Sequence, residues 1–310
     1  MKRKLFGLLS VVIAIFACTF GLTACKEDPA LRFTLSDDGT YYICEYGNVS
    51  KAEAEMVIPS VYNGKPVEEI GHFHFDNLES VTIPDSVKVI GEQAFSGCSN
   101  LKNVTIGSGV TTIGKSAFGG CNSLESITLP DNVTTIEESA FEQCHNLKNV
   151  TLGKGVKTIK GHTFYHSENL KNIVLPDTVE VIADNAFTGC GLESITIGSG
   201  VTTIGKYAFR DCKLKTVELP SSVSTIDDRA FCNCSSLETV VLDGKEKITF
   251  GDTVFYGCTS FKTIYAKSTL EEWRAAENSS PESIAWYSET TPPDDAYYWH
   301  YVDGIITNWN

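Results

Sequence analysis

The chain has 310 residues, of which 42% are hydrophobic and 21% charged, a composition typical of a folded protein with a sizeable core. From this length alone, one or two domains are expected. The formal net charge of −14 excludes the broad basic surface that nucleic-acid-binding proteins present.

The N-terminal segment has the features of a bacterial lipoprotein signal peptide. Basic residues at positions 2–4 precede an uncharged apolar run, which ends in Leu-Thr-Ala-Cys at positions 22–25. Signal peptides are removed after targeting, and the final tetrapeptide resembles a lipobox, whose cysteine carries the lipid. We therefore predict a signal peptide at 1–24, lipidation of Cys25 and a tether at 25–32, on the extracellular face of a bacterial membrane. An uncleaved single-span anchor is the alternative, because about 20 apolar residues can cross a bilayer.

Residues 33–74 contain two hairpin signals. Short β-rich arms flank Ser36-Asp-Asp-Gly39, and a second pair of arms flanks Asn63-Gly64, a dipeptide typical of type I′ turns. Because a stacked repeat follows, this segment is predicted to be its N-terminal cap and first coil.

From residue 75 to residue 265 the sequence repeats every 22 to 24 residues. Each unit reads L-x-x-V-x-I-[PG]-x-x-V-x-x-I-x-x-x-A-F-x-x-C. Val104 and Ile106 alternate with polar residues, which predicts a short strand with one buried face. A second extended piece and about one helical turn at Ala-Phe complete the unit. The phenylalanines that mark the period, with Phe75 as a shortened first step, are Phe75, Phe95, Phe118, Phe141, Phe164, Phe187, Phe209, Phe231 and Phe255.

This pattern resembles the BspA-type leucine-rich repeats of bacterial surface proteins. A single coil cannot bury both faces, whereas stacked coils can. We predict a mainly β leucine-rich-repeat solenoid of about nine coils of 22–24 residues, with short strands and single helical turns, capped at both ends. Its L-x-x-[VI] strands, from Leu78 to Phe261, would form one parallel ladder.

The resemblance also implies a function, because known members of this family are mainly surface adhesins and binding proteins without catalytic residues. We therefore expect a non-catalytic adhesion or binding module for a protein or glycan at a cell surface, with no cofactor, no nucleic-acid partner and no nucleotide. A structural spacer or envelope component without a specific ligand is the alternative.

The C-terminal part changes in composition. Ser268-Thr-Leu-Glu271 is a capping box, so residues 266–290 are predicted to form a short helix and a linker. Residues 291–310 are predicted to form an aromatic hairpin around Asp303-Gly304. Its aromatic residues offer either a binding platform or a terminal cap on the last coil, and we favour the cap; they include Trp299, Tyr301 and Trp309.

One stretch, GVTTIGKS at 109–116, satisfies the P-loop pattern. A P-loop needs a buried strand before it and a long helix after it, whose N-terminal amides bind the phosphates. The next repeat strand follows too soon for such a helix, and Val110 and Ile113 occupy core positions of the repeat. We therefore interpret the match as one register of the repeat.

Seven of the eleven cysteines share the position three residues after the repeat phenylalanine, where Ser167 occurs once. Secretion favours disulfides, but an odd number and a tolerated serine favour small buried thiols. Cys44 and Cys232 lie outside this column and are not assigned. The column consists of Cys98, Cys121, Cys144, Cys190, Cys212, Cys234 and Cys258.

No pattern for metal binding or catalysis emerges. There is no C-x-x-C pair for zinc, the histidines are scattered, and no G-x-S-x-G motif is present. We predict no enzyme activity and no metal site.

The outward-facing residues of the strands remain as the candidate contact surface. They are small and polar in most coils and vary near the C-terminal end. Threonine columns are similar to those of ice-binding solenoids, but Val174 and Glu218 interrupt them. The candidate binding residues are Asn103, Thr105, Ser126, Thr128, Asn149, Thr151, Thr196, Glu218, Val241 and Tyr265.

Overall fold

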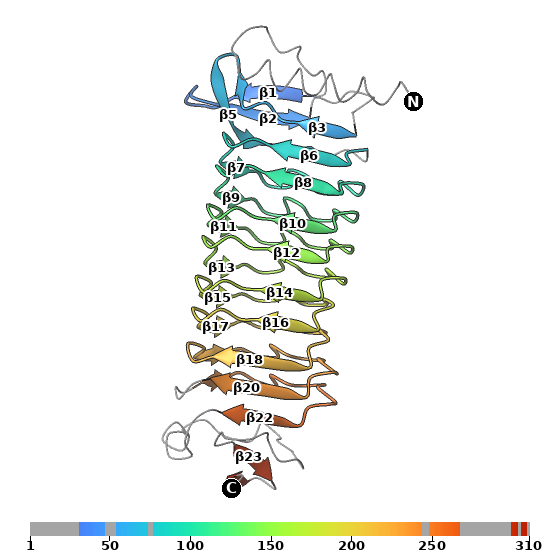
Figure 1. Ribbon diagram of the computed structural model, residues 1–310, viewed down its shortest axis with the longest axis vertical. Coiled ribbons are helices and arrows are strands. Elements are labelled where there is room, and N and C mark those ends of the chain that lie inside the picture. The colour runs from blue at the N-terminus through green and yellow to red at the C-terminus, as the bar shows by residue number, and fades with distance from the viewer. Residues whose placement is uncertain are drawn as a thin grey trace, which may run out of the picture.

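A computed structural model describes residues 31–46, 54–73, 77–243, 248–266, 299–302 and 305–308. Within these ranges the chain is a β-solenoid without helices, whose coils stack along one axis (Figure 1). No helix in the described part is long and apolar enough to cross a membrane. The predicted signal peptide, Cys25, and the short helix and linker lie outside the described residues.

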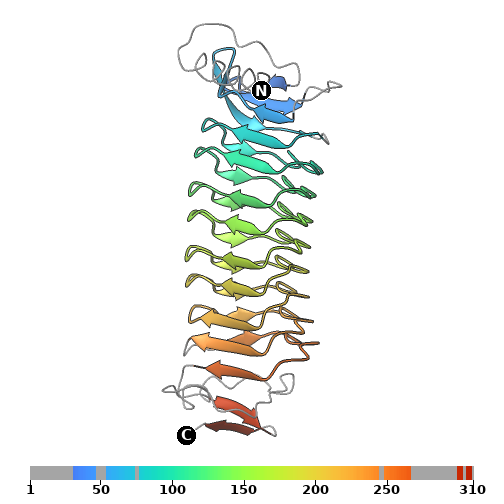
Figure 2. The same ribbon diagram turned by 45° about the vertical axis from the view of Figure 1, so that its right-hand side comes forward.

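The strands form two ladders that run along the solenoid, seen as the right and left columns of labels in Figure 1 and as stacked arrows in Figure 2. The first ladder holds the L-x-x-[VI] strands and the second holds the shorter strands that follow each turn. The first ladder consists of β3 (Glu55–Val57), β6 (Ser80–Ile83), β8 (Asn103–Ile106), β10 (Ser126–Thr128), β12 (Asn149–Thr151), β14 (Asn172–Val174), β16 (Ser194–Thr196), β18 (Thr216–Pro220), β20 (Thr239–Asp243) and β22 (Thr263–Ala266). The second ladder consists of β5 (Lys65–Ile70), β7 (Val89–Ile90), β9 (Thr112–Ile113), β11 (Thr135–Ile136), β13 (Thr158–Ile159), β15 (Val181–Ile182), β17 (Thr203–Ile204), β19 (Thr225–Ile226) and β21 (Thr249–Phe250).

The two predicted hairpins are present at the N-terminal end. Strands β1 (Leu31–Leu35) and β2 (Tyr42–Tyr46) pair antiparallel, and β2 then joins β5 of the second ladder. Strand β4 (Val61–Tyr62) pairs with β5 across Asn63 and Gly64, whose φ angles of 45° and 78° are both positive, as a type I′ turn requires. Aromatic rings fill this end, since Phe33 and Tyr62 stack with centroids 4.0 Å apart.

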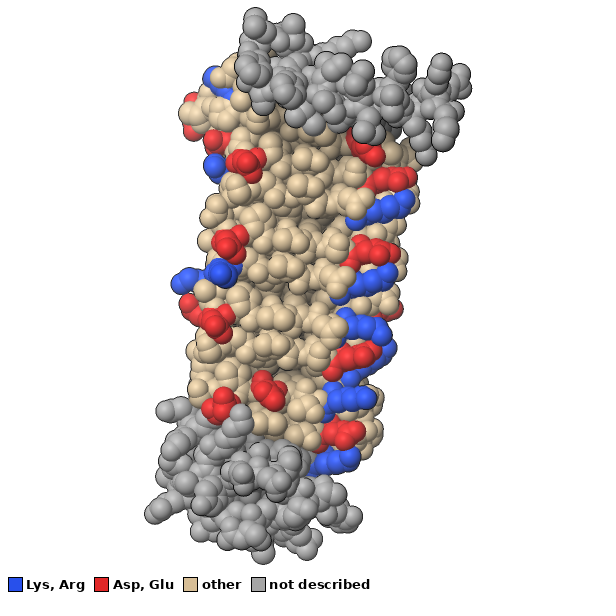
Figure 3. All heavy atoms as spheres, viewed as in Figure 1, with Lys and Arg blue, Asp and Glu red and all other residues tan. Residues whose placement is uncertain are grey.

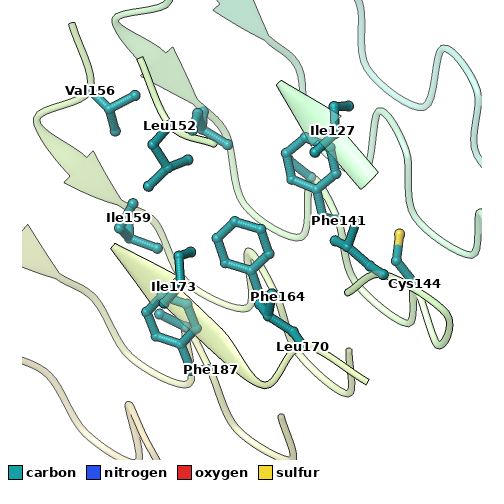
Figure 4. Packing of buried hydrophobic residues seen from close by; sticks show 14 of the residues in the cluster. Ile127, Phe141, Cys144, Leu152, Val156, Ile159, Phe164, Leu170, Ile173 and Phe187 are labelled. Carbon is teal, nitrogen blue, oxygen red and sulfur yellow. The ribbon is translucent and has the colours of Figure 1, made fainter. Parts of the chain in front are cut away.

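The core contains a continuous stack of phenylalanine rings, one from each coil (Figure 4). Neighbouring centroids lie 5.2 to 5.7 Å apart from Phe73 to Phe255. The stack begins with Phe73, which packs on Phe95 and is fully buried. The step from Phe73 to Phe95 is therefore a regular 22 residues. The shortened step expected from Phe75 is wrong, because the ring that lies one coil above Phe95 is that of Phe73.

Successive turns replace the single helical turn expected around Ala-Phe. In one coil, Ala117 N–H donates to Gly114 O at 3.2 Å and Gly119 N–H to Ser116 O at 3.0 Å. Left-handed residues interrupt any helix here, since Ser116 has φ 52° and Gly120 has φ 71°. Two positions in each coil from Phe95 to Phe255 adopt this conformation, and none of those directly before Ala-Phe, or its equivalent, is glycine.

The thiols of the cysteine column are hydrogen-bonded, and all but the partly exposed Cys258 are buried. Each Sγ donates to the carbonyl oxygen of the phenylalanine in the preceding coil, at 2.8 to 3.2 Å, and Ser167 Oγ makes the same bond to Phe141 O at 3.1 Å. A side chain that is small, buried and able to donate is what this position requires. That requirement explains why serine can replace cysteine.

Burial raises the pKa of the Cys144 thiol to about 12, from an ordinary value near 9. Between pH 9 and 12 the thiol stays protonated in the folded chain but ionises in the unfolded chain. The contribution of Cys144 to the free energy of unfolding is therefore complete below pH 9 and decreases as the pH rises towards 12. We expect wild type to lose about 1.4 kcal/mol per pH unit in this window relative to Cys144→Ser, measured by urea denaturation at each pH. Parallel losses in the two proteins would contradict this assignment.

Backbone pairing along the first ladder is interrupted at regular intervals. It stops between β8 and β10, between β12 and β14 and between β16 and β18, so the strands form four groups within the described residues. The prediction of one continuous ladder is therefore wrong on this side. The second ladder has one interruption, between β11 and β13.

Proline and glycine alternate along the strands from Pro84 to Pro220, in step with these breaks, although β6 leads into Pro84 and still pairs with β3. The strand that follows each break leads into a proline, which has no N–H to donate to the preceding coil. The next strand, which pairs with the proline strand, leads into a glycine instead. This glycine lets the backbones of the two coils approach closely, since a Cβ on Gly107 would lie 2.5 Å from Pro84 O. The prolines are Pro130, Pro176 and Pro220, and the glycines are Gly107, Gly153 and Gly198.

From Pro84 to Gly198 the coils thus come in pairs, a proline coil followed by a glycine coil. Packing differs between the two members. Val81 and Ile83 of a proline coil are 2% and 1% exposed, whereas Val104 and Ile106 of the following glycine coil are only partly buried. At each break the strand of the glycine coil thus leaves an apolar residue only partly buried: Val104, Val150 and Ile195.

Candidate binding surface

The exposed side of the first ladder is a flat face of small uncharged side chains. Parallel in-register pairing aligns Ser126 with Asn149 and Thr128 with Thr151, and all four are exposed. The same register repeats in the other groups, so the residues form two columns along the solenoid. We call this surface the neutral face. Its described members in β6 to β16 are Ser80, Thr82, Asn103, Thr105, Ser126, Thr128, Asn149, Thr151, Asn172, Val174, Ser194 and Thr196.

The neutral face changes in character towards its C-terminal end. Val174 is 63% exposed and interrupts the threonine column. Further along, Glu218 pairs in register with Val241, which pairs with Tyr265. The predicted candidate residues therefore share one surface. The side chain of Tyr265 lies outside the described part, although its backbone belongs to β22.

A ladder of alternating lysine and glutamate side chains forms one border of the neutral face, on the right in Figure 3. These residues directly precede the strands of the first ladder, and eight of the nine form ion pairs between neighbouring coils. We call this set the charge ladder: Glu79, Lys102, Glu125, Lys148, Lys171, Glu193, Lys215, Glu238 and Lys262. Among its ion pairs, Lys102 Nζ lies 2.9 Å from Glu79, Lys171 Nζ lies 3.0 Å from Glu193, and Lys262 Nζ lies 2.7 Å from Glu238.

Aspartates of the proline coils line the opposite border. Asp85 Oδ1 accepts the backbone N–H of Ser108 at 2.7 Å, and Asp177 Oδ1 accepts that of Ser199 at 2.8 Å. The backbone hydrogen bond from Ser199 lowers the pKa of Asp177. The sequence analysis did not predict that these aspartates accept backbone hydrogen bonds from the next coil. The pattern that indicates it is Pro-Asp, which recurs one coil before Gly-x-Gly. These carboxylates join the two coils of a pair.

The P-loop-like stretch has the conformation of a repeat coil. Strand β9 lies inside the motif where a phosphate loop would be, and the left-handed Ser116 begins a series of turns. The Lys115 amino group lies 3.8 Å from the Glu138 carboxylate. Nothing in this stretch presents the strand–loop–helix geometry that binds phosphate.

The turns around Ala-Phe form one edge of the solenoid, which we call the turn edge. It carries an aromatic–arginine cluster that the sequence analysis also did not predict. The guanidinium carbons of Arg210 and Arg229 lie 5.6 and 5.9 Å from the centre of the Tyr207 ring. Arg229 also donates to Tyr207 Oη at 2.7 Å, and this bond raises the pKa of Arg229. Aligning the coils on Ala-Phe would have placed these side chains together, because they occupy neighbouring positions in consecutive coils.

Histidine and cysteine side chains do not converge on a metal geometry. Within the described ranges, no group of three histidine, cysteine, aspartate or glutamate residues is placed to hold a metal ion. His162 and His166 instead contact Tyr165 edge to face on the turn edge.

The aromatic hairpin near the C-terminus is present in its backbone. Strands β23 (Trp299–Val302) and β24 (Ile305–Asn308) pair antiparallel, and β23 lies close to β22. These strands lie within the segment 291–310 for which a hairpin was predicted. Trp309 lies outside the described part, and the choice between platform and cap stays a prediction.

Comparison with known proteins identifies the repeat. The family described as BspA type leucine-rich repeat region matches residues 68–193 and 157–285, in six copies. The chain belongs to the BspA-type leucine-rich repeat family. Membership suggests a surface role in protein binding, and proteins of this kind are typically non-enzymatic. Curated protein sequences give no match to the chain.

Several solved structures of bacterial leucine-rich repeat proteins are similar to this BspA-type chain. One, from Bacteroides ovatus, has a TM-score of 0.57 at 24% identity, covering 76% of this chain and 70% of that one. The T. pallidum protein TpLRR has a TM-score of 0.45 at 26% identity, covering 84% and 99%. The pneumococcal vaccine antigen PcpA has a TM-score of 0.46 at 21% identity, covering 77% and 80%. The first of these similarities supports the solenoid fold.

Proposed function

We propose that this chain is a cell-surface binding protein, lipid-anchored at Cys25 on the extracellular face of a bacterial membrane, whose neutral face holds a protein or glycan partner without catalysis. The observation that carries the proposal is the neutral face itself, which presents hydroxyl and amide groups from β6 to β16, in register within each group of paired strands. Such groups donate and accept hydrogen bonds without the desolvation cost of charges.

Affinity would come from the length of the surface. Many weak polar contacts along the solenoid add up when the partner is extended and rigid. The exposed Val174 in the middle of the face and the more varied end at Glu218 and Val241 supply apolar and charged contacts that select among partners.

The partner is tested with the full chain, purified and probed against matrix proteins, bacterial surfaces and a glycan array. Once a partner binds, Thr128→Lys and Thr151→Lys are each expected to weaken it about tenfold or more, because a lysine would then be desolvated at the contact. The matched control is Thr134→Lys, at an exposed position beside the second ladder, which is expected to bind as wild type does.

Two results would overturn the proposal. Binding that is insensitive to both face variants would move the site elsewhere on the chain. No binding to any partner in all three screens would favour a structural spacer. The anchor has its own test, mass spectrometry of the mature N-terminal peptide. A diacylglycerol on Cys25 is the expected result, and an intact Met1 would contradict it.

A further inference from the structure

The charge ladder has an order that packing within one chain does not require. From Glu79 to Lys262 its signs read minus, plus, minus, plus, plus, minus, plus, minus, plus. Alternation between neighbouring coils explains the ion pairs within the chain. It fails once, where Lys148 is followed by Lys171, the fifth of the nine positions. The failure lies at the centre of the ladder.

This central reversal makes the ladder complementary to itself when it is turned end to end. Read in the opposite direction, eight of the nine positions meet a charge of opposite sign, and only Lys171 meets itself. The facing pairs are Glu79 with Lys262, Lys102 with Glu238, Glu125 with Lys215, and Lys148 with Glu193. Uninterrupted alternation over nine positions would instead have placed like charges opposite each other throughout.

Parallel arrangements fit less well. Two parallel copies in the same register would bring every charge against its own copy, which costs free energy at each position. A parallel copy shifted by one coil meets mostly opposite charges, but it leaves the ladder ends unpaired. Such a contact is also heterologous, so it would continue from copy to copy without closing.

We propose that two copies of this chain associate edge to edge through their charge ladders, antiparallel, with the two-fold axis at Lys171. The side chains have room for a second partner, since Glu125 is 64% exposed, Lys171 61% and Lys262 58%. The flat neutral face beside the ladder carries no charge from β6 to β16 that would oppose the approach.

The dimer is weak and sensitive to salt, because exposed ion pairs contribute little individually and are screened. It goes beyond the proposed ligand binding and does not depend on it, since its tests contain no ligand. Failure of the dimer would leave the neutral face untouched as a binding site.

A cross-linking experiment tests the symmetry directly. In an antiparallel dimer, residue 171 meets residue 171 of the second copy. The full-length variant Lys171→Cys, treated with a short bismaleimide, is expected to give about ten times more covalent dimer than Lys148→Cys, whose facing residue is Glu193. Wild type controls for the native cysteines. Equal yields from the two variants would overturn the proposal.

Charge exchange separates contacts between copies from contacts within one chain. Glu125→Lys is expected to raise the dimer Kd about tenfold or more, because two-fold symmetry turns it into two like-charge contacts. Adding Lys215→Glu restores the facing pairs and is expected to return the Kd to within about twofold of wild type. In this double variant the lysine at position 125 still lies beside Lys148 of the same chain, so the repulsion within the chain remains. Recovery of the Kd would therefore come from contacts between copies.

The control exchange, Glu125→Lys with Lys148→Glu, restores only the pair within the chain, whose amino and carboxylate groups lie 3.1 Å apart in wild type. It is expected to remain weak. Sedimentation of the full chain measures all of these variants, with thermal unfolding to verify that each is folded. Recovery by the control exchange and not by Lys215→Glu would overturn the antiparallel arrangement.

Discussion

Phe141→Ala is expected to lower the free energy of unfolding by about 3–5 kcal/mol, because it removes a fully buried ring and leaves a cavity. The ring stacks on Phe118 at 5.4 Å and on Phe164 at 5.6 Å, so both neighbouring coils lose contacts. In a solenoid each coil contacts only its neighbours, and a break in the middle separates the two halves. Urea denaturation followed by far-ultraviolet circular dichroism measures the change.

The matched control for this substitution is Val174→Ala, which shortens an exposed side chain of the same solenoid. It is expected to change the free energy of unfolding by no more than about 0.5 kcal/mol. A loss below about 1 kcal/mol for Phe141→Ala would mean that the phenylalanine stack contributes little. An unfolding curve that becomes biphasic would agree with separation of the halves.

Gly109→Ala is expected to cost about 2–3 kcal/mol or more, because the new methyl group would overlap the carbonyl oxygen of Asp85 in the preceding coil. Gly109 does not have a positive φ, so the cost comes from the close approach of two backbones and not from the conformation of the residue itself. The same denaturation experiment measures it. The result tests the pairing of proline and glycine coils.

Gly119→Ala, ten residues further on, is the matched control. Its Cβ would lie 3.4 Å from Ser116 O, and its φ is also not positive. Alanine there is expected to be neutral or stabilising by up to about 1 kcal/mol, since it restricts the unfolded chain. Equal losses at the two positions would contradict the close-approach explanation.

The sequence period was sufficient to predict the solenoid, the strand positions and the buried residues. Val110 and Ile113 are buried where the repeat places them, inside a stretch that otherwise reads as a phosphate loop. Periodicity gives this information because each buried position recurs in every coil. The hairpin at Asn63-Gly64 was predictable for a different reason, since few residues other than Asn and Gly tolerate that turn.

Other features depend on contacts between coils, which a one-coil pattern does not describe. The choice of Phe73 over Phe75 depends on which ring lies above Phe95. The turns at Ala-Phe depend on left-handed residues such as Ser116 and His162, whose types do not require that conformation. The residues of the neutral face were predictable as outward-facing strand positions, but a partner is recognised by chemistry that the core pattern does not encode.

The pairing of proline and glycine coils also bears on how such a gene can change in length. Pro84, Pro130, Pro176 and Pro220 are spaced by 46, 46 and 44 residues, which is two coils each time. Proline already stacks on proline once, where Pro59 after β3 precedes Pro84 after β6, without an aspartate bridge. Between Pro84 and Pro220, loss or duplication of one coil would remove the acceptor or the donor of an aspartate bridge between coils. In this region, two coils together are therefore the unit by which recombination, or a protein engineer, can lengthen or shorten the chain and keep every aspartate bridge.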